Sequence, residues 1–364
     1  MKPLLVDLET QWRGGQNQAL LLLKGLRARG HEPELVAVTG SALEERASTG
    51  GISVHPVDRF LKPAQAALEI RHLLKSESFD VVHANEPHAL TAAWLARAHS
   101  RVPLIVSRRV GYPLSKSWLA RRRYHAAMKL VAISQWSAKQ AIDSGAPSSK
   151  VTVVHEGVEL PRLPSSQARQ AARAQWNIPE SAALLGCVGV LSPDKGQEWL
   201  IRALALVRRE FTGCKLLLAG DGPCRAKLEQ LAAELGLQDA VLFPGFVKDV
   251  ESIYSALDLF LLPSFFEALS NALMSAMAYG IPSIAFNVGG PAEIIEHGVS
   301  GLLVEPAKEH ALADAIVKML RDQAFAQRLG KQGRNRIERD FSADQMVQGI
   351  LSVYEQAWQQ YPKK

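Results

Sequence analysis

A single carboxylate, Glu267, precedes a helical pattern that is otherwise almost wholly apolar, in the stretch SFFEALSNALMSAMAYG that begins at residue 264. Ser270 is a suitable N-cap for this helix. The amides of Leu269, Ser270 and Asn271 are then expected to point out of the helix start, where a bound anion would satisfy them. Glu267 is close enough to contact a group attached to a bound phosphate. The alternative is an ordinary surface carboxylate.

One hydroxyl, Ser275, interrupts the apolar part of the same helix. It follows Asn271 by four positions, so the two side chains share one helix face. The helix is therefore expected to carry a polar stripe that begins at the end where Glu267 lies.

A lysine, Lys195, stands before a second helical pattern, in the stretch GVLSPDKGQEWLIRAL that begins at residue 189. A cation near a helix N-terminus opposes the helix dipole and costs a fraction of a kcal/mol, about 0.3–1 kcal/mol at an exposed position. That placement makes sense if an anion binds between the lysine and the helix. A lysine merely exposed in a loop is the alternative.

A glycine pair, Gly14 and Gly15, follows the first predicted strand in QWRGGQNQ. Glycines permit close backbone approach, and the next helix offers its N-terminal amides to an anion. No G-x-G-x-x-G dinucleotide motif is present, and an ordinary tight turn is the alternative. A further strand–loop–helix pattern, FNVGGPAEIIEHGVSGLLVEP, begins at residue 286.

The elements that position these residues alternate between short β-rich runs and helical patterns, which is typical of parallel sheets covered on both faces. The alternation pauses around GVELPRLPSSQARQ, a predicted linker, and then restarts. We therefore predict an α/β fold of two doubly wound domains, residues 1–162 and 163–342, followed by a helix over 343–364. Ligands of such sheets bind beyond the carboxyl ends of the strands, so two facing domains would form a cleft.

Length and composition indicate a globular protein, with 364 residues, 47% hydrophobic and 21% charged. Asp7 and Glu9 interrupt the apolar run that a signal peptide would need. No apolar run approaches the roughly 18 residues of a membrane-spanning helix. Three cysteines without paired spacing favour a reducing compartment. We expect a soluble cytoplasmic protein.

The net charge is +6, and the positive charge is concentrated in one segment. Residues 87–142 contain ten Lys or Arg and no Asp or Glu, all ten lying within 97–139. A solvated basic face is one interpretation, and a surface for anionic lipid or a phosphorylated acceptor is the other. Nucleic acid is the least favoured partner, because no recognised binding module accompanies the charge. The basic residues are Arg97, Arg101, Arg108, Arg109, Lys116, Arg121, Arg122, Arg123, Lys129 and Lys139.

Taken together, these loops resemble one family nearly end to end: the retaining, nucleotide-sugar-dependent glycosyltransferases of the GT-B fold, which include sucrose synthases and bacterial lipopolysaccharide and mannosyl transferases. The matching stretches include RGGQ, DVVHANEPHA, VAISQWSA, VVHEGVE, GVLSPDKG, LAGDGP and FPGFVKDV. The two most specific are PSFFEALSNALMSAMAYGIP and VGGPAEIIEHGVSGLLVEP. The resemblance implies that the terminal helix crosses back onto the first domain.

The resemblance also implies a role for each loop. Gly14 and Gly15 would approach the donor diphosphate, and Lys195 would neutralise it. Glu267 would contact donor sugar hydroxyls, and Phe246 lies in the loop expected near the base. The amides of residues 269–271 would bind the diphosphate. No D-x-D motif follows a strand, so no metal and no other cofactor is expected.

Three positions depart from the family pattern. Val190 stands where the family commonly has an arginine, which puts one diphosphate contact in doubt. Arg109 replaces a histidine that often follows the fifth strand. Ser275 replaces the second glutamate of a carboxylate pair, at the position that normally holds the nucleotide ribose.

The resemblance implies transfer of a sugar from a nucleotide-diphosphate sugar to a glycan or lipid-linked acceptor, in cell-envelope polysaccharide or lipopolysaccharide synthesis. The catalytic residues implied are Lys195, Glu267 and Arg109. A glycoside hydrolase would need two carboxylates about 5 Å apart or wider, and the sequence indicates no such pair. A sugar-nucleotide epimerase and a non-catalytic sugar-nucleotide-binding protein are the alternatives.

Overall fold

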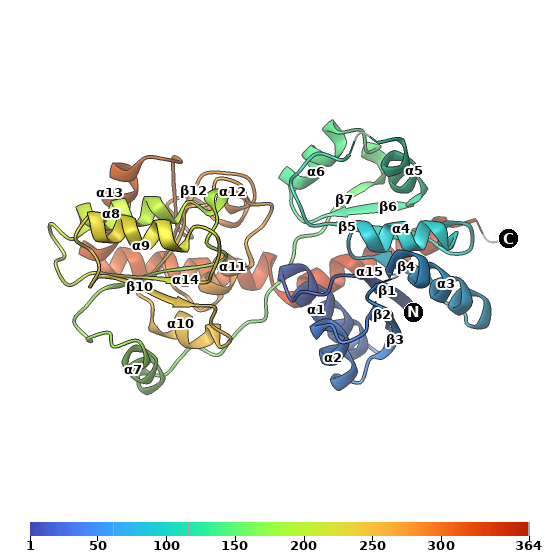
Figure 1. Cartoon of the computed structure of the whole chain (residues 1–364), viewed down its shortest axis with the longest axis horizontal. Coiled ribbons are helices and arrows are strands. Elements are labelled where there is room, and N and C mark those ends of the chain that lie inside the picture. The colour runs from blue at the N-terminus through green and yellow to red at the C-terminus, as the bar shows by residue number, and fades with distance from the viewer. Residues whose placement is uncertain (61, 116, 363–364) are drawn as a thin grey trace. The chain divides into compact units, whose positions relative to one another are not determined.

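A computed structural model describes residues 1–60, 62–115 and 117–362, apart from the side chain of Lys62. The chain forms two compact units (Figure 1). The first consists of Met1–Gly157 together with Ala343–Lys364, and the second of Val158–Ser342. Residues 158–162, which we assigned to the first domain from the sequence, lie in the second unit.

The first unit contains a parallel seven-stranded sheet in the order β3-β2-β1-β4-β5-β6-β7. Its strands are β1 (Pro3–Asp7), β2 (Glu34–Val38), β3 (Ser53–Val57), β4 (Val81–Ala84), β5 (Leu104–Arg108), β6 (Lys129–Ala132) and β7 (Val151–Val153). Its helices are α1 (Gly14–Ala28), α2 (Ala42–Thr49), α3 (Lys62–Ser76), α4 (Pro87–Leu95), α5 (Trp118–Ala126), α6 (Gln135–Asp143) and α15 (Ala343–Gln360).

The second unit contains a parallel six-stranded sheet in the order β10-β9-β8-β11-β12-β13. Its strands are β8 (Leu184–Val188), β9 (Lys215–Ala219), β10 (Val241–Gly245), β11 (Leu259–Leu262), β12 (Ser283–Phe286) and β13 (Leu302–Val304). Its helices are α7 (Ser166–Gln175), α8 (Gln197–Val207), α9 (Arg225–Glu234), α10 (Val250–Ala256), α11 (Asn271–Ala278), α12 (Pro291–Ile294), α13 (Glu309–Arg321) and α14 (Gln323–Asp340).

Both sheets are doubly wound, as the alternation predicts. The central strands β8 and β11 of the second sheet are apolar, whereas β1, β4 and β5 of the first sheet carry the buried polar residues Asp7, His83, Ser107 and Arg108. Strand order reverses between β1 and β4 in the first sheet and between β8 and β11 in the second. At such a reversal the connections leave in opposite directions and open a crevice beyond the carboxyl ends of the strands. These two crevices are where chemistry is expected.

The terminal helix α15 completes the core of the first unit, although it is distant in sequence. Its apolar face, which includes Val347, Ile350 and Tyr354, packs in one buried cluster with apolar residues of α1. Figure 1 shows α15, in red, running beside the strands of this unit. Tyr354 also hydrogen-bonds His83 of β4, with 2.7 Å between Oη and Nδ1.

The predicted linker is shorter in the structure. Val158 already pairs with Ser342, and its amide donates to the Phe341 carbonyl at 3.0 Å. At its other end, Ser165 caps α7 by accepting from the Ala168 amide. The polar SSQARQ segment therefore begins a helix rather than continuing a linker.

Candidate active site

In the second unit, the loops after β8, β11 and β12 are joined by backbone hydrogen bonds. The Phe265 amide donates to the Asp194 carbonyl at 2.8 Å, and the Gly290 amide donates to the Glu267 carbonyl at 2.9 Å. Because these parallel strands end at the same edge of the sheet, the residues singled out from three separate stretches of sequence come together.

Two glycines make this close packing possible. A Cβ atom on Gly196 would lie 2.3 Å from the Pro263 carbonyl oxygen, and the residue has φ +64. A Cβ atom on Gly290 would lie 2.3 Å from the Ala268 carbonyl oxygen. Any other residue would push the loops apart, so these glycines fix where Lys195 and Glu267 lie.

Lys195 and Glu267 form an ion pair, with 2.6 Å between Nζ and Oε2. Their side chains are 24% and 14% exposed, so neither is the plain surface charge that the sequence left open as an alternative. Burial raises the pKa of Glu267, while the neighbouring Lys195 charge opposes that rise. The pair flanks the point of strand-order reversal, between β8 and β11.

The helix start beside this pair is as the sequence predicts. Ser270 is the N-cap of α11, and its hydroxyl accepts from the Leu273 amide at 3.3 Å. Leu269 and Ser270 are buried. The positive end of the α11 dipole therefore lies next to Glu267 in sequence and close to Lys195 in space.

Ser275 is half-buried and has a partner within its own unit. A side-chain hydrogen bond joins it to Tyr254, and the Tyr254 hydroxyl also donates to the Ala272 carbonyl at 3.4 Å. Asn271 is half-buried on the same helix. The predicted polar stripe is thus present, with a buried phenol beside it.

Two further predicted positions are exposed. Phe246, directly after β10, is 81% exposed, and Val190, after β8, is 57% exposed. The Val190 carbonyl accepts from the Gln197 side chain at 2.9 Å, which fixes the loop. An apolar side chain therefore faces solvent where the resemblance leads us to expect an arginine.

In the first unit, Arg109 is held between two partners at the end of β5. Its Nη1 donates to Glu156 Oε1 at 2.5 Å. Its Nε and Nη2 donate to Asn85 Oδ1 at 3.2 and 2.7 Å. The Arg109 side chain is 16% exposed and that of Glu156 is 5% exposed.

Asn85 links this arginine to a carboxylate at the end of β1. Its Nδ2 donates to Asp7 Oδ2 at 2.6 Å and to the Gly15 carbonyl at 3.3 Å. A Cβ atom on Gly15 would lie 3.3 Å from Arg109 Cδ. The structure therefore brings Gly15 and Arg109 together, while Gly14 is exposed at the first position of α1.

Asp7, Asn85 and Glu156 were not identified as site residues from the sequence. Each is a polar residue that ends or closely follows a predicted strand, at β1, β4 and β7. The rule that ligands lie beyond strand ends could have selected them. Nothing local, however, indicates that these three strand ends meet at one arginine.

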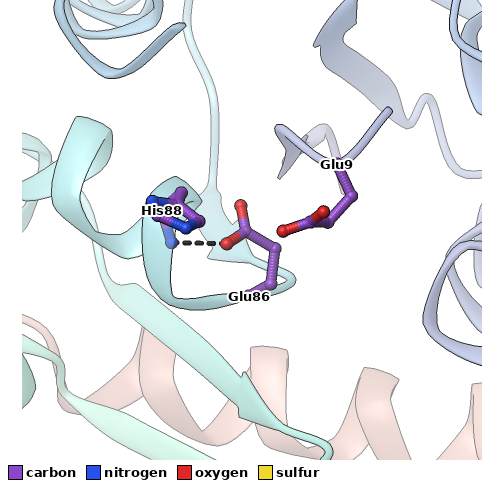
Figure 2. A group of neighbouring side chains, drawn as sticks. All are labelled: Glu9, Glu86 and His88. Atoms are coloured by element: carbon purple, nitrogen blue, oxygen red, sulfur yellow. Dashed lines mark hydrogen bonds between the residues drawn. The ribbon is translucent and has the colours of Figure 1, made fainter. Parts of the chain in front are cut away.

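Glu9, Glu86 and His88 form a further cluster in the first unit, shown in Figure 2, whose possible ligand atoms lie within 4.8 Å of one another. Glu86 caps α4: its carboxylate accepts from the amides of His88, Ala89 and Leu8. Burial raises the pKa of Glu86 to about 7. We therefore assign the Glu86 carboxylate to capping the electropositive start of α4.

The basic segment is not uniform. Arg108 is buried and donates to the Tyr112 carbonyl, and Arg123 donates to Thr91.

On α5, Arg121 and Arg122 are exposed beside Trp118, which is 67% exposed. Lys116 lies outside the described residues. Among the described residues, no helix is long and apolar enough to cross a membrane.

Comparison with known proteins agrees with this arrangement. A family model described as Glycosyltransferase Family 4 matches residues 12–162, and one described as Glycosyl transferases group 1 matches residues 168–336. The D-inositol 3-phosphate glycosyltransferase of Mycolicibacterium smegmatis is 30% identical over 307 residues, which cover 78% of this chain and 68% of that protein.

Two further similarities extend over more of the chain. A GDP-mannose-dependent alpha-(1-6)-phosphatidylinositol monomannoside mannosyltransferase of Mycobacterium tuberculosis is 28% identical over 80% of both proteins. The crystal structure of Anabaena Alr3699/HepE in complex with UDP-glucose has a TM-score of 0.85, with 24% identity over 98% of this chain and 100% of that chain. The chain therefore belongs to the nucleotide-sugar-dependent glycosyltransferases of the GT-B fold.

Proposed function

We propose that the protein is a retaining glycosyltransferase of the hexosyltransferase type, whose second unit binds a nucleotide-diphosphate sugar without a metal. The single observation that carries the proposal is the Lys195–Glu267 pair at the strand-order reversal, beside the start of α11. A cation and a helix N-terminus are the groups that hold a diphosphate. An adjacent carboxylate can accept hydrogen bonds from sugar hydroxyls.

Lys195 and Glu267 neutralise each other in the structure. Donor binding would exchange that bond for two others, from Lys195 to the diphosphate and from sugar hydroxyls to Glu267. The lysine and the helix dipole then stabilise the charge that develops as the nucleotide leaves. The residues around Leu269, Ser270 and Asn271 supply backbone amides, and Phe246 lies near the base.

Retention follows if the acceptor hydroxyl attacks the anomeric carbon on the face that the nucleotide leaves. A donor phosphate oxygen takes the hydroxyl proton, so the reaction needs no enzymic nucleophile. In this proposal Gly14, Gly15 and Arg109 serve the reaction from the first unit, where Arg109 supplies positive charge and N–H donors. Ser275 contributes a weaker ribose contact than a carboxylate would.

The acceptor we propose is a glycan or a lipid-linked sugar of the cell envelope, such as a lipopolysaccharide precursor. The M. tuberculosis relative is named for a phosphatidylinositol monomannoside acceptor, which supports a lipid-linked one. We place the protein in the cytoplasm, at the inner face of the membrane, with Arg121, Arg122 and Trp118 toward anionic lipid. Co-sedimentation with anionic vesicles that weakens with salt would support this location, and equal binding to neutral vesicles would contradict it.

A non-catalytic sugar-nucleotide-binding protein is the second candidate, favoured by the exposed Val190 side chain at a position where the resemblance implies an arginine. The two candidates differ in turnover. Calorimetric titration with a panel of nucleoside diphosphates identifies the base. NMR of the matching donor sugars with protein then follows hydrolysis or transfer and the anomeric configuration of the product. A donor that binds but is never consumed favours the second candidate, and an inverted product contradicts the retaining mechanism.

A further inference from the structure

We propose that Asp7 is a positioning residue for the transfer reaction: through the Asn85 side chain it sets the orientation of the Arg109 guanidinium. The inference rests on the proposed function, because it assumes that Arg109 acts on the reactants. It concerns residues that the sequence did not single out for this role, and it is carried by the geometry of a buried hydrogen-bond chain in the first unit.

The first step is the burial of Asp7. The residue is 0% exposed at the end of β1. Its carboxylate accepts from Asn85 Nδ2 at 2.6 Å, from Gln16 Nε2 at 3.0 Å and from the Glu9 amide at 3.0 Å. Burying a carboxylate is costly unless donors compensate it, and these three donors do so. The remaining residues of β1 are apolar, so a carboxylate here needs a reason beyond folding.

The second step concerns the side-chain amide of Asn85. Its nitrogen and oxygen can exchange places by rotation unless hydrogen-bond partners fix the orientation. A carboxylate only accepts hydrogen bonds, so Asp7 requires the nitrogen of the Asn85 amide to face it. The amide oxygen must then face the opposite direction, where it accepts from both Nε and Nη2 of Arg109. Asp7, together with the Gly15 carbonyl that also accepts from Nδ2, thus holds the Asn85 amide with its oxygen toward the arginine.

The third step is the guanidinium itself. Glu156 holds Nη1 at 2.5 Å from the opposite side, and the two partners together fix the plane of the group. These contacts use three of the five N–H groups that an arginine offers. One N–H group on each Nη remains, and the missing side chain of Gly15 leaves room against Arg109 Cδ. A planar donor fork held in this way suits phosphate oxygens or sugar hydroxyls.

A purely structural role is the competing explanation, and the same sheet offers a matched control for it. His83 on β4 and Ser107 on β5 precede Asn85 and Arg109, which directly follow these strands, by two residues. They form a second buried chain with Tyr354, at 2.7 Å and 2.8 Å from the His83 ring nitrogens. Loss of a hydrogen bond in this second chain should lower stability without changing the orientation of Arg109. Tyr354→Phe is therefore the control variant.

The test is a charge swap. Asn85→Asp alone places two carboxylates against each other and should lower kcat by at least about tenfold, since a misplaced catalytic group can cost about a hundredfold. Asp7→Asn alone replaces an acceptor-only carboxylate by an amide that can present either end to Asn85, so kcat should fall several-fold, with donor KM within about threefold. In the double variant Asp7→Asn/Asn85→Asp, the new amide at 7 donates to the new carboxylate at 85, which still accepts from Arg109. Activity should then recover to within about threefold of wild type.

The outcomes separate the inference from the proposed function. Tyr354→Phe should lower the Tm and leave kcat/KM unchanged, and Arg109→Ala should abolish most activity. If Arg109→Ala is inactive but both single variants keep wild-type kcat, or if the double variant recovers nothing, the positioning role is wrong and the proposed function stands. If Arg109→Ala is fully active, the catalytic role proposed for Arg109 fails as well. Should a charge-changing variant not fold, Asn85→Ala breaks the chain without adding charge, and wild-type kcat in that variant would equally overturn the inference.

Discussion

Each unit holds a cation–carboxylate pair beyond the carboxyl ends of its strands, and the two pairs are built differently. In the second unit, Lys195 and Glu267 contact each other on loops, and the lysine side chain is 24% exposed. In the first unit, Arg109 is fixed by Glu156 and by Asn85, and Glu156 is 5% exposed. A flexible lysine with one partner can exchange it for a ligand, whereas an arginine held from two sides is a fixed donor fork.

This difference suggests a division of work. On the proposed function, the pair in the second unit should open when a diphosphate binds, because Lys195 would then follow the phosphate and Glu267 would turn to the sugar. We expect the pair in the first unit, which is held from two sides, to keep one geometry. Variants of the exchangeable pair should therefore change activity more than stability, and variants of the fixed pair should change both.

The largest expected effect is that of Lys195→Ala. It removes the cation that stabilises the leaving diphosphate, so kcat/KM should fall at least about a hundredfold, since such groups contribute roughly 2.7–4 kcal/mol. Lys227→Ala is the matched control, because Lys227 also pairs with a glutamate, at 3.5 Å, but is 76% exposed. Steady-state kinetics of both variants decide. Activity of Lys195→Ala within about threefold of wild type would remove this lysine from the site.

Glu156→Gln should lower the stability of the protein more than the corresponding change in the other pair, Glu267→Gln. It leaves the buried Arg109 charge with a neutral partner, and hydrogen bonds to charged groups contribute about 1.5–3 kcal/mol, so the free energy of unfolding should fall by about that amount. Glu267→Gln should cost less, because Lys195 can turn toward water. Urea unfolding followed by fluorescence compares the two variants. Equal losses would mean that the pairs are energetically alike.

The pH dependence of stability tests the raised pKa of Glu86, the N-cap of α4. Burial raises the pKa of Glu86 from 4.5 to about 7. The folded protein therefore binds this proton more tightly than the unfolded chain, and the contribution of Glu86 to stability falls as the pH rises from about 4.5 to about 7. Glu86→Gln keeps an oxygen for the α4 amides but cannot ionise. The Tm of wild type relative to this variant should decline across that range, whereas parallel Tm curves would refute the raised pKa.

The sequence was sufficient for the fold and for part of the site. Strand–helix alternation predicts both sheets, and Ser270 was identified as an N-cap from its type and position alone. Lys195 and Glu267 were identified separately, each by its relation to a following helix. Their ion pair was not predicted, because they are far apart in sequence and meet only through the packing around Gly196 and Gly290.

The first-unit network was harder to predict for a physical reason. The sequence PLLVD indicates only that Asp7 ends a strand. The residues around Asn85 and Glu156 do not indicate which side chains these two contact. Their function depends on which strands are neighbours, and the sheet order places β1 beside β4 and β4 beside β5. Helix caps depend on local sequence, whereas a hydrogen-bond chain across strands depends on topology.

The smallest expected effect is that of Ser275→Glu, which measures how much nucleotide affinity the serine costs at the proposed ribose contact. A carboxylate could accept two ribose hydroxyls where serine leaves at least one bond unmade, about 0.5–1.5 kcal/mol. Ser275 is half-buried and hydrogen-bonded to Tyr254, whose hydroxyl would turn from the Ala272 carbonyl to donate to a glutamate at this position. We therefore expect nucleoside diphosphate binding to tighten several-fold, with no change in the sugar transferred. Calorimetric titration of both proteins with one nucleotide measures this change in affinity. Weaker binding or a lower Tm would mean that the new carboxylate is buried without a partner from the ligand. Ser275 would then be a residue that packs against Tyr254, and the ribose would be held elsewhere.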